Sequence, residues 1–239
     1  MPPNELIFDG DALSLLANGE IEVVHRMPYS SNATFLVTVS LGDKSIRAIY
    51  KPLRGERPLW DFEPGLHRRE VAAYRLSEAM GLGMVPPTVL RDGPAGEGSV
   101  QFFIDADVEA HYFNLFEQHP ELHDTFRDMC AFDIVANNTD RKAGHCLIDK
   151  IQQVWGIDHG VCFSADFKLR TVIWEFGGEE LSPSLVTACA NLANTVPLEV
   201  ATLLADDEIA ALQERAQWLV DGGAFPVDRS RSRYPWPLV

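Results

Sequence analysis

The period of hydrophobic and polar positions changes near the middle of the chain. In roughly the first hundred residues, short apolar runs alternate with polar positions and are bounded by Gly, Pro, Asn and Asp, which is typical of β-strands. These runs predict strands over 21–25, 34–39, 45–52, 85–90 and 99–104. A clear helical period occurs among them over 66–80, closed by Gly81, and a helical turn is expected over 11–19.

Beyond residue 105 the pattern becomes mainly helical. Helices are predicted over 111–118, 121–137, 183–194, 197–204 and 206–220, with a short hairpin over 146–149 and 153–157. The tail over 222–239 has no periodicity. We therefore predict an α+β fold of two lobes, with a β-rich lobe over 1–104 that contains one clear helix and a mostly helical lobe over 105–239. A cleft between two lobes is a common place for a ligand site.

Two loop acids are the strongest candidates for chemistry. Asp140 follows the apolar run 132–136, and Asp158 follows a second apolar run and precedes Gly160. Each alone is most simply a turn residue, because Asp is common in turns beside Asn or Gly. Together they suggest a phosphotransferase, in which Asp140 orients or deprotonates an attacking hydroxyl and Asp158 binds Mg²⁺.

Further candidates precede these loops in the order that such an enzyme requires. Lys51 ends a predicted strand and can contact nucleotide phosphates, and Glu70 in the next helix can pair with it. Ser30, Ser31 and Asn32 lie between two strands, where backbone N–H groups could bind phosphate. That loop lacks a G-x-G-x-x-G motif, and an ordinary hairpin loop explains it equally well.

Charge and composition limit the partners. The 239 residues carry a net charge of −15, which opposes binding to nucleic acid and to anionic membranes. ATP would be repelled as well, so a nucleotide site is expected to need a divalent cation. The chain opens without a signal-peptide pattern and has no run long enough to span a membrane, which predicts a cytoplasmic protein without integral membrane association. The four Cys residues show no metal-binding spacing.

The ordered set Lys51, Glu70, Asp140-Arg141 and Asp158-x-Gly160 resembles the atypical kinase group of phosphatidylinositol 3- and 4-kinases and HipA-type toxin kinases. Within that group it looks most similar to an actinobacterial SCO-type family. The resemblance spans about residues 20 to 220 and implies a protein-kinase-like fold that uses ATP and Mg²⁺. In such relatives an Asn five residues after the catalytic Asp binds a second metal ion.

The position of that Asn is taken here by His145, and His159 stands where these kinases have the Phe of Asp-Phe-Gly. Imidazole is a poorer ligand than an oxygen atom for Mg²⁺, so His145 favours a phosphate contact, a softer metal ion such as Mn²⁺, or a site in which only one metal ion binds strongly. Three functions fit these residues: a phosphotransferase acting on a small-molecule or protein hydroxyl, a nucleotide-binding pseudokinase acting as a scaffold or sensor, and an enzyme that transfers AMP. A scaffold without a nucleotide would leave the ordered polar loops unexplained.

Overall fold

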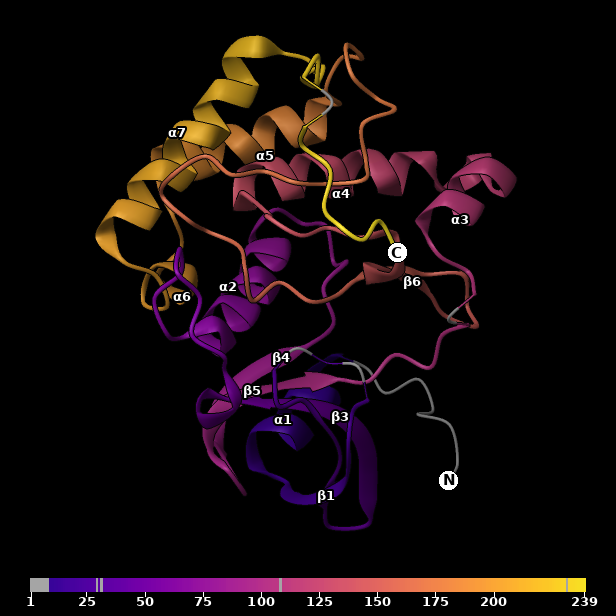
Figure 1. The fold of residues 1–239 in the computed structure, drawn as a ribbon, viewed down its shortest axis with the longest axis vertical. Helices are drawn as coiled ribbons and strands as arrows, with labels where there is room; N and C mark the ends of the chain where they lie inside the picture. The colour runs from indigo at the N-terminus through magenta and orange to yellow at the C-terminus, as the bar shows by residue number, and fades with distance from the viewer. Residues whose placement is uncertain (1–8, 29, 31, 108, 231) are drawn as a thin grey trace.

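A five-stranded antiparallel sheet occupies the first half of the chain in the computed structural model, which describes residues 9–28, 30, 32–107, 109–230 and 232–239 (Figure 1). The strands lie in the order β1-β2-β3-β5-β4. Their bounds are β1 (Glu20–Arg26), β2 (Phe35–Leu41), β3 (Lys44–Pro52), β4 (Thr88–Gly93) and β5 (Gly96–Phe102). Helix α1 (Asp9–Asn18) packs against the sheet, where its Leu15 and Leu16 are buried with apolar side chains of the strands.

Strand β3 places its side chains on two different faces. Ile46, Ala48 and Tyr50 are buried in the small core between the sheet and α1. Successive side chains of a strand point to opposite faces, so Lys51 projects away from that core. It points toward helix α2 (Leu66–Ala79), where it meets Glu70.

Helix α2 connects the sheet with the helical half of the molecule, and most of its residues are buried. Its apolar side chains join the larger core, whereas the Arg69 guanidinium pairs with Glu208 at the start of α7. Arg68 donates a hydrogen bond to the Thr202 carbonyl at 2.8 Å. Contacts on all sides therefore fix the position of this helix.

The second half of the chain is helical apart from one short hairpin. Its helices surround a core built mainly on α4, and Figure 1 shows them above the sheet. Their bounds are α3 (Tyr112–Gln118), α4 (His123–Ala136), α5 (Pro183–Asn194), α6 (Leu198–Ala201) and α7 (Asp206–Gly222), and the hairpin consists of β6 (Cys146–Ile148) and β7 (Val154–Gly156). Single 3₁₀ turns lie at Leu53–Gly55, Pro120–Leu122 and Ala143–His145.

Beyond Gly222, where α7 ends, the described part of the C-terminal tail forms neither helix nor strand, but it packs against the body of the protein. Thr171 donates its backbone N–H to the Arg233 carbonyl, and Ala143 donates to the Leu238 carbonyl. The Arg233 guanidinium lies 4.8 Å from the Phe167 ring centroid. These contacts place the tail beside the segments that flank the candidate site.

The predicted α+β fold class is confirmed, and differences at element ends have local causes. Strand β4 begins at Thr88 rather than at residue 85 because Pro86 and Pro87 cannot donate ladder hydrogen bonds. The expected helix over 121–137 begins with a 3₁₀ turn, and the helix expected over 197–204 is only Leu198–Ala201. All four cysteines are buried free thiols. None of the helices in the described residues is long and apolar enough to cross a membrane.

His67 joins three parts of the β-rich half. Its Nδ1 lies 2.8 Å from Glu56 Oε1, and its Nε2 lies 3.1 Å from Glu97 Oε1 on β5. Glu56 also accepts the backbone N–H groups of Gly65 and His67 at the start of α2. Burial acts to lower the pKa of His67, but the two carboxylates outweigh it and raise that pKa.

A raised folded-state pKa predicts a stability contribution that is fully present below about pH 6.5 and is lost as the pH rises through the folded value. We therefore expect His67→Gln to lower Tm by about 2–4 °C at pH 6, the equivalent of about 1 kcal/mol, and by less at pH 9. Calorimetric melts across this pH range test the prediction. His119→Gln is the control, because its ring contacts one exposed carboxylate. A deficit in the His67 variant that does not change with pH would contradict the prediction.

Candidate active site

Lys51 meets two carboxylates that come from different elements. Its Nζ pairs with Glu70 Oε1 of α2 and lies 2.8 Å from Asp158 Oδ1, in the loop after β7. The Glu70 side chain is 3% exposed, whereas that of Asp158 is 54% exposed. One lysine thus links the sheet, the helix and the loop, with Asp158 open to the solvent.

The three groups shift one another's protonation. The positive charge of Lys51 is the main cause that lowers the pKa of Asp158. Burial acts to lower the pKa of Lys51, but Asp158 and Glu70 raise it above its usual value. Burial raises the pKa of Glu70 despite the opposing effect of Lys51. At neutral pH we therefore treat Lys51 as a cation and Asp158 as an anion.

Glu70 also fixes the loop that carries Asp158. Its Oε2 accepts the backbone N–H of His159 at 3.0 Å. A Cβ atom at Gly160 would lie 3.3 Å from Glu70 Oε1 and 3.4 Å from Leu66 Cβ, so the glycine allows α2 to approach closely. Asp158 itself has φ +61°, a left-handed conformation that Asp tolerates better than most residues.

His145 lies beside Asp158, with its Nε2 3.5 Å from Asp158 Oδ2. The backbone N–H of Lys142 donates to His145 Nδ1 at 3.4 Å, which leaves the ring proton on Nε2, facing Asp158. Burial lowers the pKa of His145, although Asp158 acts against this shift. A neutral imidazole therefore borders the exposed carboxylate.

Asp140 lies in the neighbouring loop after α4. Its backbone N–H donates to Asn138 Oδ1 at 3.0 Å, and its Oδ2 lies 3.1 Å from Lys142 Nζ. Burial raises the pKa of Asp140, while Lys142 acts to lower it and the charge of Asp158 adds to the rise. A carboxylate with a raised pKa is a better proton acceptor than an ordinary surface Asp.

A fully buried ion pair lies beneath these two loops. Arg141 Nη2 is 2.9 Å from Asp133 Oδ1, and both side chains are 0% exposed. Asp133, on the last turn of α4, also accepts hydrogen bonds from Asn138 Nδ2 at 2.9 Å and Thr171 Oγ1 at 3.1 Å. The carboxylate therefore gathers donors from three places along the chain.

Arg141 connects the two acidic loops through its remaining N–H groups. Nη1 donates to the Ile157 carbonyl at 3.1 Å and to the His145 carbonyl at 3.3 Å. Nη2 lies 2.7 Å from His159 Nε2, which accepts because burial and then Arg141 lower the pKa of His159 well below its usual value. The positions of Asp140 and Asp158 thus depend on one buried guanidinium.

The structure brings together five of the eight residues that the sequence singles out. Lys51, Glu70 and Asp158 touch one another, His145 faces Asp158, and Asp140 lies in the adjoining loop. The structure gives the positions of these side chains, whereas their roles in binding and catalysis stay predictions.

In the loop between β1 and β2, two of the three predicted phosphate-binding residues make contacts within the protein. Ser30 Oγ lies 2.8 Å from Thr34 Oγ1, and Asn32 Oδ1 accepts the backbone N–H of Arg57. Ser31 lies outside the described residues. Phosphate binding by this loop therefore also stays a prediction.

Sequence reasoning passed over Asp133 and Asn138, which hold the loops from below. The signal was present, because Asp133 is the only charged residue between Met129 and Ala136. An acid inside an apolar helical run implies a buried partner, since an unpaired buried charge is costly. Arg141 is that partner.

The chain is similar in sequence to a known protein and in fold to several solved structures. No family model matches the chain. Protein Rv2133c of Mycobacterium tuberculosis is 38% identical to it over 95% of each chain.

Among solved structures, a Golgi casein kinase has TM-score 0.56 and 16% identity, covering 92% of this chain and 79% of its own. A hydra Fam20 protein solved with sugar has TM-score 0.57 and 14% identity, covering 91% and 88%. The Helicobacter pylori proinflammatory kinase CtkA has TM-score 0.54 and 11% identity, covering 88% and 94%. The fold is thus kinase-like, since the chain shares it with these proteins and two of them are kinases.

Removal of one charge from the buried pair is expected to destabilise the fold strongly. Asp133→Asn leaves Arg141 without its counter-ion, which costs about 3–5 kcal/mol in comparable buried pairs. Urea unfolding of the variant measures the loss. Asp128→Asn on the same helix is the control, because burial and Asp124 raise the pKa of Asp128 and so already disfavour its charge. Equal losses in the two variants would show that the ion pair has no special role.

Proposed function

This chain belongs to the same family as Protein Rv2133c, and we propose that it is an ATP-dependent phosphotransferase that acts on a hydroxyl acceptor. The observation that carries the proposal is the contact of Lys51 with both Glu70 and Asp158. In a kinase-like fold these are the positions of the phosphate-binding lysine, its helical partner and the metal-binding aspartate. We place the chain in the phosphatidylinositol 3/4-kinase-like group on the same ordered residues.

Lys51 would bind the phosphates of ATP. Its charge is secured by Glu70, which is almost fully buried and holds the ammonium group in place. Asp158 is half exposed, so its carboxylate is open to a ligand from the cleft. Binding of nucleotide would exchange the contact between Lys51 and Asp158 for contacts with phosphate oxygens.

A divalent cation fits the donors on this side of the cleft. Asp158 and Asp140 offer the carboxylate oxygens that Mg²⁺ prefers, whereas His145 presents its Nε2 proton to Asp158 and would bind an ion such as Mn²⁺ only once that proton has left Nε2. Among the described residues no group of three or more His, Cys, Asp or Glu side chains could hold a metal ion on its own. That agrees with Mg²⁺ sites in which one or two carboxylates share the ion with phosphates and water. When bound, the ion would neutralise phosphate charge.

Asp140 would orient the acceptor hydroxyl and accept its proton. Its raised pKa favours proton acceptance, and Lys142 keeps the carboxylate in place at 3.1 Å. The hydrogen bond from its backbone N–H to Asn138 limits movement of the loop. The residues of the chain thus supply a cation for phosphate, an anion for metal and a base for the acceptor.

One observation favours a second function. His145 replaces the metal-binding Asn of the resembling kinases, and its proton points at Asp158. A nucleotide-binding pseudokinase that acts as a scaffold or sensor is therefore the second candidate. Transfer of AMP in place of the terminal phosphate uses the same residues and is a variant of the first proposal.

The two acids are expected to separate nucleotide binding from turnover. Asp158→Asn keeps a residue that tolerates φ +61° but removes the negative charge, so metal-dependent ATP binding should fall at least about tenfold. Asp140→Asn should leave ATP affinity within about threefold and lower turnover by about 10²–10⁴. Titration calorimetry with ATP, with and without Mg²⁺ or Mn²⁺, and ADP release measure the two effects.

Asp149→Asn is the matched control for these variants, because Asp149 closes the turn of the hairpin. Wild-type protein that binds no ATP under any metal condition would overturn the phosphotransferase proposal. Wild-type protein that binds ATP without turnover would favour the pseudokinase.

Replacement of His145 tests the metal preference. His145→Asn offers an amide oxygen in place of the imidazole, and we expect Mg²⁺-supported turnover to rise relative to Mn²⁺-supported turnover. The ratio of the two rates at saturating metal is the measurement. A loss of turnover with both ions would show instead that the imidazole itself is required.

A further inference from the structure

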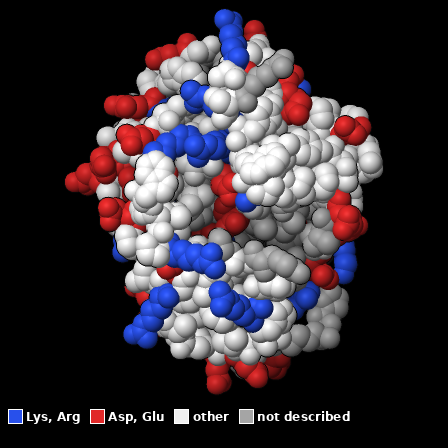
Figure 2. Space-filling view, in the orientation of Figure 1, with Lys and Arg blue, Asp and Glu red and all other residues white. Residues whose placement is uncertain are grey.

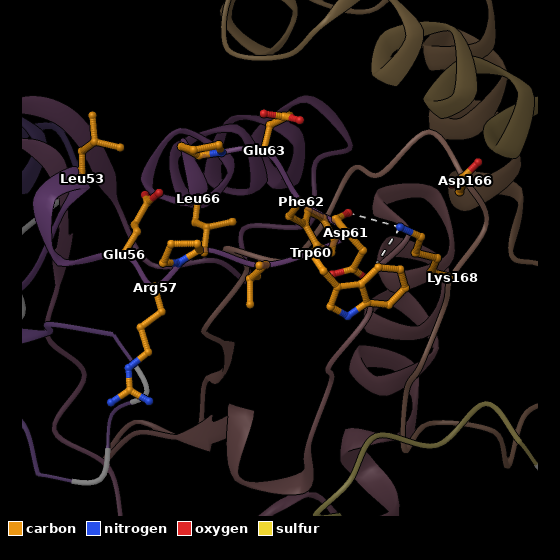
Figure 3. Close-up of a pocket in the computed structure, with 13 residues that line it drawn as sticks. Leu53, Glu56, Arg57, Trp60, Asp61, Phe62, Glu63, Leu66, Asp166 and Lys168 are labelled. Atoms are coloured by element: carbon orange, nitrogen blue, oxygen red, sulfur yellow. Dashed lines mark hydrogen bonds and ion pairs between the residues drawn. The ribbon is translucent and has the colours of Figure 1, made fainter.

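A groove of about 500 Å³ opens beside the candidate active site. One wall is the segment between β3 and α2, and the other is the segment around Asp166 and Lys168, which follows the Asp158 loop (Figure 3). Trp60, Phe62 and Leu66 line it with their apolar side chains. None of the residues to which the proposed phosphotransfer assigns a role lines this groove.

The groove is joined directly to the catalytic loops. Leu66, in its wall, lies where it would touch a Cβ atom at Gly160, two residues beyond Asp158. Lys168, in the opposite wall, donates its backbone N–H to Asn137 Oδ1 at 2.9 Å, at the start of the loop that carries Asp140. The walls of the groove therefore contact the two loops that carry the candidate acids.

Trp60 is held in an exposed position by its neighbours. The Lys168 ammonium lies 5.4 Å from the Phe62 ring centroid and 5.9 Å from that of Trp60. It is itself anchored by the Asp61 carbonyl at 3.2 Å and the Asp61 carboxylate at 3.6 Å. The Trp60 residue is nonetheless 94% exposed. An exposed, supported indole is typical of a residue that anchors a partner.

Further exposed aromatic side chains lie outside the groove. Phe167, next to Lys168, is 46% exposed, and its ring centroid lies 6.5 Å from that of Trp218, which is 51% exposed. Exposed aromatic side chains therefore occur both in the groove and on the adjoining segment that reaches α7, which is more than a small acceptor needs. Extended apolar patches with polar rims mark protein-binding sites.

Charge indicates the chemistry of the partner. Two acids in the groove lining, Glu63 and Asp166, make no side-chain hydrogen bond or ion pair with another described residue. The chain as a whole has a net charge of −15, and in the view of Figure 2 acidic side chains lie mainly around the margins, with basic side chains between them. A basic side chain on the partner would complement these free carboxylates.

We propose that the groove binds the acceptor as a segment of another protein chain, with an apolar side chain against Trp60 and a basic side chain near Glu63 and Asp166. This inference rests on the proposed phosphotransferase function. A Ser or Thr hydroxyl oxygen of the segment would form the new bond to the terminal phosphorus of ATP. The bond from that phosphorus to the bridging oxygen breaks, ADP leaves, and the hydroxyl proton passes to Asp140.

The test is phosphorylation of a degenerate peptide library with a fixed central Ser or Thr, using ATP labelled in its terminal phosphate. Wild-type protein should select an apolar residue at one position and Lys or Arg at another. Trp60→Ala should raise the KM for a selected peptide at least about tenfold and leave the KM for ATP unchanged. Trp236→Ala is the control, because Trp236 is 87% exposed and does not line the groove.

Charge reversal gives an independent readout. Glu63→Lys with Asp166→Lys should change the library preference from basic to acidic residues, whereas Glu22→Lys with Asp43→Lys, which changes net charge equally on the exposed sheet, should not. Unchanged selectivity and peptide KM in the groove variants would overturn the inference. The inference is also overturned if the wild type turns over ATP with a small polyol such as glycerol but labels no peptide. If the wild type binds no ATP, both the proposed function and this inference are wrong.

Discussion

The buried ion pair between Asp133 and Arg141 is the interaction on which the candidate site depends. Neither side chain reaches solvent. The other N–H groups of Arg141 donate hydrogen bonds to backbone carbonyls of both acidic loops and to His159. Such a pair adds little net stability, because removing two charges from water offsets much of their attraction. Its value is geometric, since a guanidinium with a fixed fork of donors allows few alternative arrangements of the loops. Asp133 and Arg141, which a nucleotide would not touch, therefore fix the distance between Asp140 and Asp158.

Charge balance is the reason that the proposed nucleotide would need a cation beside it. Lys51 faces two carboxyl groups, so its positive charge is already balanced before any phosphate arrives, and the whole chain is acidic as well. Polyphosphate alone would be repelled from such a site. The half-exposed carboxylate of Asp158 is the group best placed to share a divalent ion with the phosphates, which would release Lys51 to contact them. The burial of Glu70 then matters, because one carboxylate has to remain with Lys51 throughout.

Sequence patterns predicted the fold class, most elements and the grouping of five site residues, because those features depend on local periodicity and on the order of motifs. Lys51 and Glu70 are each unremarkable alone, and only their order with Asp140 and Asp158 pointed to a site. The roles of Asp133 and the groove around Trp60 were not predicted. A buried acid in the sequence implies a partner but does not identify it. The groove is formed by two segments about one hundred residues apart, and no local sequence pattern relates them.

Helix α2 links the parts of the molecule that these arguments treat one by one. Glu70 contacts Lys51, Leu66 forms a wall of the groove, His67 ties the helix start to β5, and Arg69 pairs with α7. Because a helix moves as a rigid body over so short a length, a shift at its first turn would displace Glu70 about one turn further along. The groove wall at Leu66 and the acid that holds Lys51 therefore keep a fixed spacing of about one turn on a single helix.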